Sequence, residues 1–261
     1  MTYDLGVLFG TSVGYLGILF LIAYYADRKV IPTTWIDHPV TYSLSLGVYA
    51  SSWTYYGSVG FADSNGYLFL TIYLGVTLAF ILSPVLLKPL LKLTREHQLT
   101  SLADLFSFRY RSQLAGIMVT LFMLVGSLPY IALQIRAVTE SLQILTQQTT
   151  PDILALGFCL TLMLFAILFG ARHASPREKH RGLVAAVAFE SLVKLIALLL
   201  IGIYAIYFIF DGPNNLGDWL KINPDAVTAL FESTQNQSWF TLILLSFSAA
   251  FLLPRQFHML F

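Results

Sequence analysis

Long apolar runs alternate with short polar segments along the whole chain. Most of these runs are about 20 residues or longer, which is the length that an α-helix needs to cross a bilayer. The pattern predicts an all-α membrane protein with about seven spans, at residues 5–26, 41–66, 67–87, 114–145, 153–171, 183–210 and 239–261. The last run reaches residue 261 without a polar flank, so we expect the chain to be the N-terminal piece of a longer protein.

The second run, residues 41–66, is a poor helix in its middle. No charged residue occurs over positions 39–62, yet Ser51 and Ser52 compete for backbone hydrogen bonds and Gly57 loosens the chain. Irregular backbone at membrane depth survives only where protein or a water-filled cavity covers it. The run therefore predicts a discontinuous helix that faces a site at mid-membrane. A kinked helix packed through small residues is the alternative.

The last run contains a second candidate break, in the sequence FLLPRQFH at positions 251–258. Pro254 removes a backbone donor and interrupts the hydrogen-bond ladder of the helix. Arg255, Gln256 and His258 follow where backbone groups are freed. A guanidinium group binds a substrate carboxylate in a bidentate way, which makes Arg255 a candidate binding residue. The alternative is that Arg255 only anchors the helix at the cytoplasmic side.

Two pairs of opposite charges lie inside predicted spans at the i,i+4 spacing that brings side chains together on one helix face. A charge at mid-membrane costs roughly 2.5–3.5 kcal/mol on insertion scales, so it is rarely idle. Glu190 and Lys194 are therefore candidates for a coupling role, although a structural pair with Lys194 reaching the cytoplasmic edge is the alternative. Arg136 and Glu140 also fit an interfacial pair, and Gln134 beside them can face a cavity.

The two breaks together predict the binding site. If they face each other, the polar and aromatic side chains near them bind a small polar solute. Trp53 would stack on a ring of that solute or cover it. The candidate binding residues are Ser51, Ser52, Trp53, Tyr56, Gln134, Arg255, Gln256 and His258.

Composition narrows the class of protein. Hydrophobic residues make up 57% of the chain and charged residues only 11%, compared with about 25% charged residues in a soluble domain. The mean hydropathy of +0.72 agrees with a polytopic protein in a lipid bilayer. Cys159 is the only cysteine, which excludes an internal disulfide and a thiolate metal cage. The net charge of +1 comes without a basic stripe, so we expect no nucleic-acid partner. His173 and His180 lie in a basic loop and are expected to be solvated.

Loop charge predicts the orientation in the membrane. If alternate loops share a side, one side carries 11 basic residues and the other carries only Lys221. We therefore expect a multi-pass protein of the bacterial inner membrane, with its N-terminus outside and the basic loops in the cytoplasm. The 11 residues are Arg28, Lys29, Lys88, Lys92, Arg95, Arg109, Arg111, Arg172, Arg177, Lys179 and Arg181.

Several stretches resemble the sodium/solute symporter family. They are the second run with its break, LTSLADLFSFRYRS, GLVAAVAFESLVK and LLPRQFH. More narrowly, a second set is together most similar to the membrane domain of CbrA-type sensor histidine kinases: SLGVYASSWTYYGSVGFA, YLGVTLAFILSP, LTSLADLFSFRYRSQLAG, LPYIALQIRAVTES and LPRQFH. The resemblance implies the N-terminal part of a leucine-transporter-like fold built from inverted five-helix repeats. Residues 1–40 would be an extra helix and loop, residues 41–210 the first repeat, and residues 237–261 the start of the second.

The resemblance also brings in sodium as an ion. The family binds it through backbone carbonyls that match Gly47 and Ala50, with further ligands from a later helix. This sequence has Glu190-Ser191 and Lys194 where the family signature has Thr-Asp and Gln, and Tyr49 where proline carriers have an aspartate. Coupling to protons, or sensing without transport, therefore stays open. No other cofactor is implied.

The leading functional hypothesis is a symporter-like input domain that binds and transports a small nutrient, by resemblance an amino acid such as histidine. It would pass its occupancy to kinase domains of the same protein in the cytoplasm, and from there to a response regulator. The alternatives are a stand-alone sodium- or proton-coupled transporter and a membrane anchor that binds no solute. No nucleotide loop or phosphoacceptor box occurs in these residues, so we expect no catalytic site here.

Overall fold

A computed structural model describes residues 3–51, 54, 57–147, 155–160, 163, 181–232 and 239–260. All regular secondary structure among them is helical, which confirms the all-α class. Within this described part, four helices are long and apolar enough to cross a membrane, at Gly6–Asp27, Ser58–Ile81, Gln113–Thr146 and Arg181–Ile209. The pair Trp239–Leu252 and Pro254–Leu260 makes a fifth span if it is counted as one. The predicted span at 153–171 lies mostly outside the described residues, so the seven-span, leucine-transporter-like arrangement stays a prediction.

The chain divides into two units, each described here by itself. Unit 1 is Met1–Tyr42 with Thr100–Ala186, and unit 2 is Ser43–Leu99 with Val187–Phe261. Unit 1 holds α1 (Leu5–Asp27), α2 (Thr33–Ile36), α7 (Leu102–Tyr110), α8 (Gln113–Thr146) and the first residues of α10 (Arg181–Tyr204). Helix α3 (Pro39–Ser45) and helix α10 contribute residues to both units.

Helix α1 is tied to the start of α10 in unit 1. Ala26 and Ile36 form a buried apolar cluster with Ala185. The Asp27 carboxylate accepts a hydrogen bond from the backbone N–H of Gly182 at 2.7 Å, which satisfies one of the donors that a helix N-terminus leaves open. Arg181 adds an ion pair to Asp37 outside this cluster, at 2.9 Å. A distant part of the chain therefore caps α10.

In unit 1, contacts join segments that are predicted, from the charge of the loops, to lie on the same side of the membrane. The N–H of Tyr3 donates to the carbonyl of Leu145 at 3.0 Å, and both residues belong to segments predicted outside. Asp27 and Gly182 belong to segments predicted in the cytoplasm. These contacts agree with the predicted alternation of sides, whereas which side is cytoplasmic stays a prediction.

Helix α7 begins with a capping box at Ser101. The Ser101 hydroxyl accepts from the N–H of Asp104 at 3.0 Å, and the Asp104 carboxylate accepts from the N–H of Ser101 at 3.0 Å. Thr100 donates to the same carboxylate through its hydroxyl, at 2.9 Å. Partial burial raises the pKa of Asp104, but the hydrogen bonds from Ser101 and Thr100 together outweigh it and hold this pKa below the ordinary carboxyl value.

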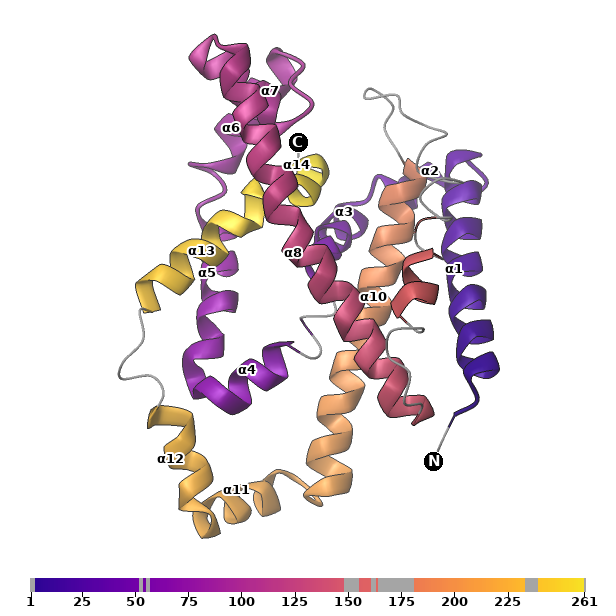
Figure 1. The fold of residues 1–261 in the computed structure, drawn as a ribbon, viewed down its shortest axis with the longest axis vertical. Coiled ribbons are helices and arrows are strands. Elements are labelled where there is room, and N and C mark those ends of the chain that lie inside the picture. Colours follow the sequence, from indigo (N-terminus) through magenta and orange to yellow (C-terminus); the bar gives the residue numbers. More distant parts are fainter. Residues whose placement is uncertain are drawn as a thin grey trace. The chain divides into compact units, whose positions relative to one another are not determined.

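Unit 2 contains the two predicted breaks and the best-packed helix pair. Its remaining elements are η1 (Leu46–Tyr49), α4 (Ser58–Asn65), η3 (Gly66–Phe69), α5 (Leu70–Ile81), α6 (Leu87–Glu96), η6 (Ala205–Ile209), α11 (Pro213–Ile222), α12 (Pro224–Glu232), α13 (Trp239–Leu252) and α14 (Pro254–Leu260). Helices α5 and α13 lie side by side (Figure 1). Small residues at four-residue spacing are buried on both helices, which allows the backbones to approach closely. They are Thr71, Gly75 and Ala79 on α5 and Ser246 and Ala250 on α13.

Two helices, α11 and α12, occupy most of the polar segment at residues 211–232. Helices α11 and α12 each begin at a proline, where the missing N–H is tolerated because the first helical donors have no partner inside the helix. Gly66 has a φ of +50° and a Cβ there would overlap the carbonyl of Leu230 in α12. The rings of Tyr67 and Phe231 meet beside it at 4.8 Å.

Candidate functional site

The first predicted break is confirmed between η1 and α4. The backbone leaves the helix at Ala50, which is extended with φ −71° and ψ 113°. Ser51 then forms a local turn with Thr54: the N–H of Thr54 donates to the Ser51 carbonyl at 2.9 Å, and the Thr54 hydroxyl accepts from the N–H of Ser51 at 3.2 Å. The backbone is helical again at Thr54 and Gly57, which are π-helical, and α4 follows from Ser58. Three predicted binding residues, Ser52, Trp53 and Tyr56, lie outside the described residues.

The second predicted break is confirmed at Leu253. Helices α13 and α14 meet there at an angle of 55°, and Pro254 opens the second of them. The predicted binding residues of α14 differ in exposure. Gln256 is buried, with 2% of its surface accessible, whereas Arg255 is half-buried and His258 is exposed. Among these three, only Gln256 points wholly into the protein.

The two breaks meet through Gln256. Its side-chain Nε2 donates to the backbone carbonyl of Leu46 in η1 at 3.2 Å. Its Oε1 is buried and has no hydrogen-bond partner among the described residues. A buried acceptor without a donor costs roughly 1–3 kcal/mol, so this oxygen is prepared to accept from a group that the described residues do not provide.

Helix α10 approaches the first break from another direction. A Cβ added to Gly47 would lie 2.6 Å from the Ser191 hydroxyl oxygen, so only glycine allows this close approach. Three residues further along both segments, the Lys194 ammonium donates to the carbonyl of Ala50 at 2.9 Å. Lys194 also pairs with Glu190 at 2.6 Å. The predicted Glu190–Lys194 pair is therefore present, and it is attached to the break.

We call this set the break cluster: Leu46, Gly47, Ala50, Glu190, Ser191, Lys194 and Gln256. It lies entirely within unit 2. Polar groups from η1, α10 and α14 converge there at the two helix breaks. Transporters that contain discontinuous helices bind solutes and ions at such breaks.

The two carbonyls predicted to hold an ion already have donors. The Gly47 carbonyl accepts from the N–H of Ala50 at 2.9 Å, and the Ala50 carbonyl accepts from Lys194. No group of three or more His, Cys, Asp or Glu side chains able to hold a metal occurs among the described residues. A carbonyl has two lone pairs, so this geometry leaves the ion prediction open.

The remaining predicted polar residues belong to unit 1. Gln134 lies half-buried on α8. Arg136 donates to Glu140 at 2.6 Å one turn further along, and both side chains are more than half exposed. This exposure favours the interfacial alternative for the Arg136–Glu140 pair.

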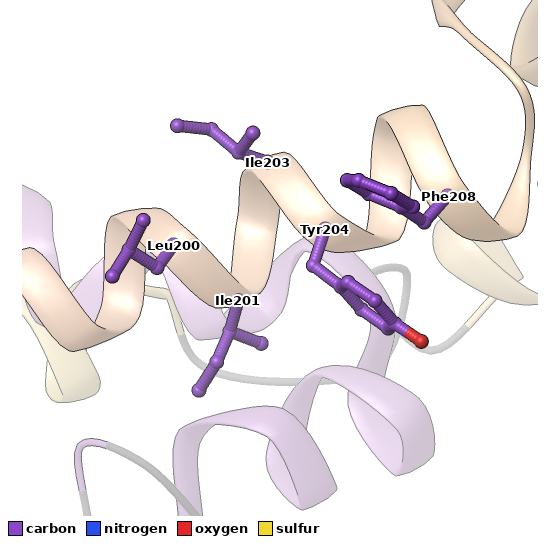
Figure 2. A pocket seen from close by; sticks show the side chains of 5 residues that line it. All are labelled: Leu200, Ile201, Ile203, Tyr204 and Phe208. Carbon is purple, nitrogen blue, oxygen red and sulfur yellow. The ribbon is translucent and has the colours of Figure 1, made fainter.

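An apolar hollow on α10 and η6 is a poor candidate for binding a polar solute. Figure 2 shows that its lining side chains project from this one helical stretch. They are Leu200, Ile201, Ile203, Tyr204 and Phe208. The rings of Tyr204 and Phe208 stack at 5.3 Å, and the Tyr204 hydroxyl is the only polar side-chain group in the lining. Such a surface suits lipid or another apolar helix.

Sequence reasoning missed how α10 reaches the break. Ser191 was noted only as a departure from the family signature, and Lys194 was paired with Glu190 without any link to the break. The usable signal was chemical: a helix break frees carbonyls, and an ammonium in a neighbouring span is a natural donor to them.

Comparison with known proteins identifies a symporter as a distant relative. The chain is 25% identical to the uncharacterized symporter YhjB of Bacillus subtilis strain 168 over 224 residues, which cover 82% of this chain and 42% of the relative. The chain thus spans about two fifths of that protein's length. No family model and no solved structure matches the chain. The similarity supports a symporter-like membrane protein.

Proposed function

We propose that the chain is part of a symporter-like membrane domain that binds a small polar solute at the break cluster. The observation that carries this proposal is the contact between the two breaks, with the Gln256 carboxamide buried at their meeting point. The distant similarity to a symporter supports the same class of protein.

The chemistry of the site favours a solute that carries a hydrogen-bond donor. Oε1 of Gln256 needs an N–H or O–H group, which an amino acid supplies through its ammonium or its side chain. Arg255, the neighbouring residue on α14, would bind the carboxylate of such a solute. An amino acid such as histidine is therefore the first substrate to test, as the resemblance to CbrA-type proteins also suggests.

Solute binding could serve either of two functions in the whole protein: sensing or transport. By resemblance, the domain is the sensory input of a histidine kinase, and binding changes phosphoryl transfer in the same protein. The symporter relative favours a stand-alone transporter coupled to sodium or protons. Autophosphorylation of the full-length protein that depends on the solute would support the first candidate, whereas uptake into vesicles without any phosphorylation would support the second.

Loss of the Gln256 carboxamide is expected to weaken solute binding roughly tenfold, since one hydrogen bond is worth about 1–1.5 kcal/mol. Binding of L-histidine and the other common amino acids to the full-length protein is measured for Gln256→Leu, Arg255→Lys and Trp53→Ala. Gln98→Leu, whose side chain is exposed on another segment, is the matched control. If all three variants bind like wild type while they remain folded, the site lies elsewhere.

Single cysteines at the ends of the predicted loops are expected to label from opposite sides of the membrane. Glu96→Cys lies on the predicted cytoplasmic side and Asn214→Cys on the predicted outer side, and both positions are exposed. The background is Cys159→Ser, because Cys159 is the only native thiol. An impermeant reagent added to intact cells should label Asn214→Cys alone. Labelling of Glu96→Cys from outside would refute the predicted orientation.

A further inference from the structure

Polar contacts of Lys194 join different parts of unit 2. Its ammonium donates to the carbonyl of Ala50 at 2.9 Å and pairs with Glu190 at 2.6 Å. Ala50 is the residue at which η1 ends, so its carbonyl accepts no hydrogen bond from an N–H group of η1. The side chain therefore crosses from α10 to the open end of the broken helix.

An open helix end of this kind attracts positive charge. Carbonyls freed at the C-terminal end of a half-helix carry partial negative charge, and within a membrane they need a donor or a cation. Unwound carbonyls in membrane proteins commonly bind inorganic cations for this reason. At this break, a side chain of the protein itself provides the positive charge.

The surrounding residues hold the ammonium in this position. The close approach of Gly47 and Ser191 fixes α10 against η1, and the contact of Ala50 with Lys194 follows three residues later on both segments. Glu190 lies one turn before Lys194 and neutralises its charge. The Lys194 side chain is only 27% exposed and the Glu190 side chain 34%. Two independent contacts thus position one charge.

We propose that Lys194 is the cation of the first break: a tethered ammonium that occupies the place of a bound inorganic cation. The break is then held closed by an interaction between η1 and α10 that no change in external sodium can remove. Folding of the break cluster consequently needs no sodium. The readout is stability and not solute binding. This proposal can therefore fail while the proposed function stands, and the proposed function can fail while this proposal stands.

The test is the melting temperature of the purified full-length protein in sodium chloride and in choline chloride at equal ionic strength. Wild type is expected to melt at the same temperature in both salts. Lys194→Ala should lose several degrees in choline, because the Ala50 carbonyl and the Glu190 carboxylate lose their shared cation. Sodium, or propylammonium, which replaces the atoms deleted from the lysine, should restore most of that loss.

Two control variants separate this effect from general loss of charge. Lys194→Met fills the space without charge, so it should be destabilised and should not respond to propylammonium. Lys221→Ala removes a lysine that pairs with Asp218 at 2.7 Å on exposed α11, away from either break, and should show no response that is specific to one cation. A Lys194→Ala variant that melts like wild type, or that neither cation stabilises, overturns the proposal.

If Lys194→Ala cannot be purified in any salt, the melting temperature of the wild-type protein in the two salts tests the proposal. A melting temperature that rises in sodium but not in choline shows that an inorganic cation is needed beside Lys194, and this overturns the proposal. An unchanged melting temperature supports it. Recovery of folded Lys194→Ala only when sodium or propylammonium is present throughout purification also supports it.

Discussion

Replacing Gly75 by leucine is expected to separate α5 from α13 and to prevent stable folding of unit 2. A Cβ at this position would lie 2.5 Å from the carbonyl oxygen of Ile243, 2.6 Å from Cβ of Ser246 and 2.7 Å from the amide nitrogen of Phe247. Two of these three neighbours are backbone atoms, which cannot rotate away as a side chain can. The helices themselves must therefore move apart, and the close packing that small residues provide is lost.

Alanine at the same position gives a more quantitative test. Alanine favours a helix over glycine by roughly 0.5–1 kcal/mol, so a helix with free space at the site should gain stability. At Gly75 we expect a loss instead, of about 1–3 kcal/mol from overpacking. Gly60→Ala in α4 is the matched control, because nothing in the described structure lies within 4 Å of an added Cβ there.

The measurement is the melting temperature of the two alanine variants in the same detergent. Gly75→Ala should melt below wild type, and Gly60→Ala should melt at or above it. Adding Ser246→Gly removes one of the three neighbours and should restore part of the loss. Equal behaviour of the two alanine variants would show that α5 and α13 do not pack this closely in the membrane.

Features that depend on local chemistry were predictable from the sequence. The break after Ala50 follows from the paired serines, and the break at Leu253 follows from Pro254, because each disrupts the backbone ladder where it stands. The helices α11 and α12 were not predictable in this way. Turn residues such as Gly212-Pro213 also start a helix, and both segments are too short and polar to resemble a membrane span.

Features that depend on distant parts of the chain were not predictable from one sequence. Helical spacing pairs Lys194 with Glu190, but the Ala50 carbonyl that Lys194 also binds lies 144 residues away. The same holds for the contact of Gly75 with α13, because a glycine in an apolar run indicates close packing without naming the partner. Among the predicted binding residues that the structure describes, Gln256 is hydrogen-bonded to the other break, at Leu46.

The Glu190–Lys194 pair is expected to show strong, unequal effects in a double-mutant cycle. Glu190→Ala leaves the ammonium with the Ala50 carbonyl as a remaining partner. Lys194→Ala removes the ammonium from both the carboxylate and that carbonyl. Lys194→Ala should therefore cost more stability than Glu190→Ala. Both singles should be costly, because removing one partner strands a charge in the span.

The double variant should cost less than the sum of the two singles, with a coupling energy of about 1–3 kcal/mol. It should not return to wild type, because the Ala50 carbonyl still lacks its donor. The exposed pair Lys92–Glu96, with 3.7 Å between the charged atoms, has the same spacing and is the control, with an expected coupling of roughly 0.2–0.5 kcal/mol. Melting temperatures and denaturant midpoints of all four combinations give the cycle. Additive losses would refute the pairing, and a larger cost for Glu190→Ala than for Lys194→Ala would show that the Ala50 contact contributes little.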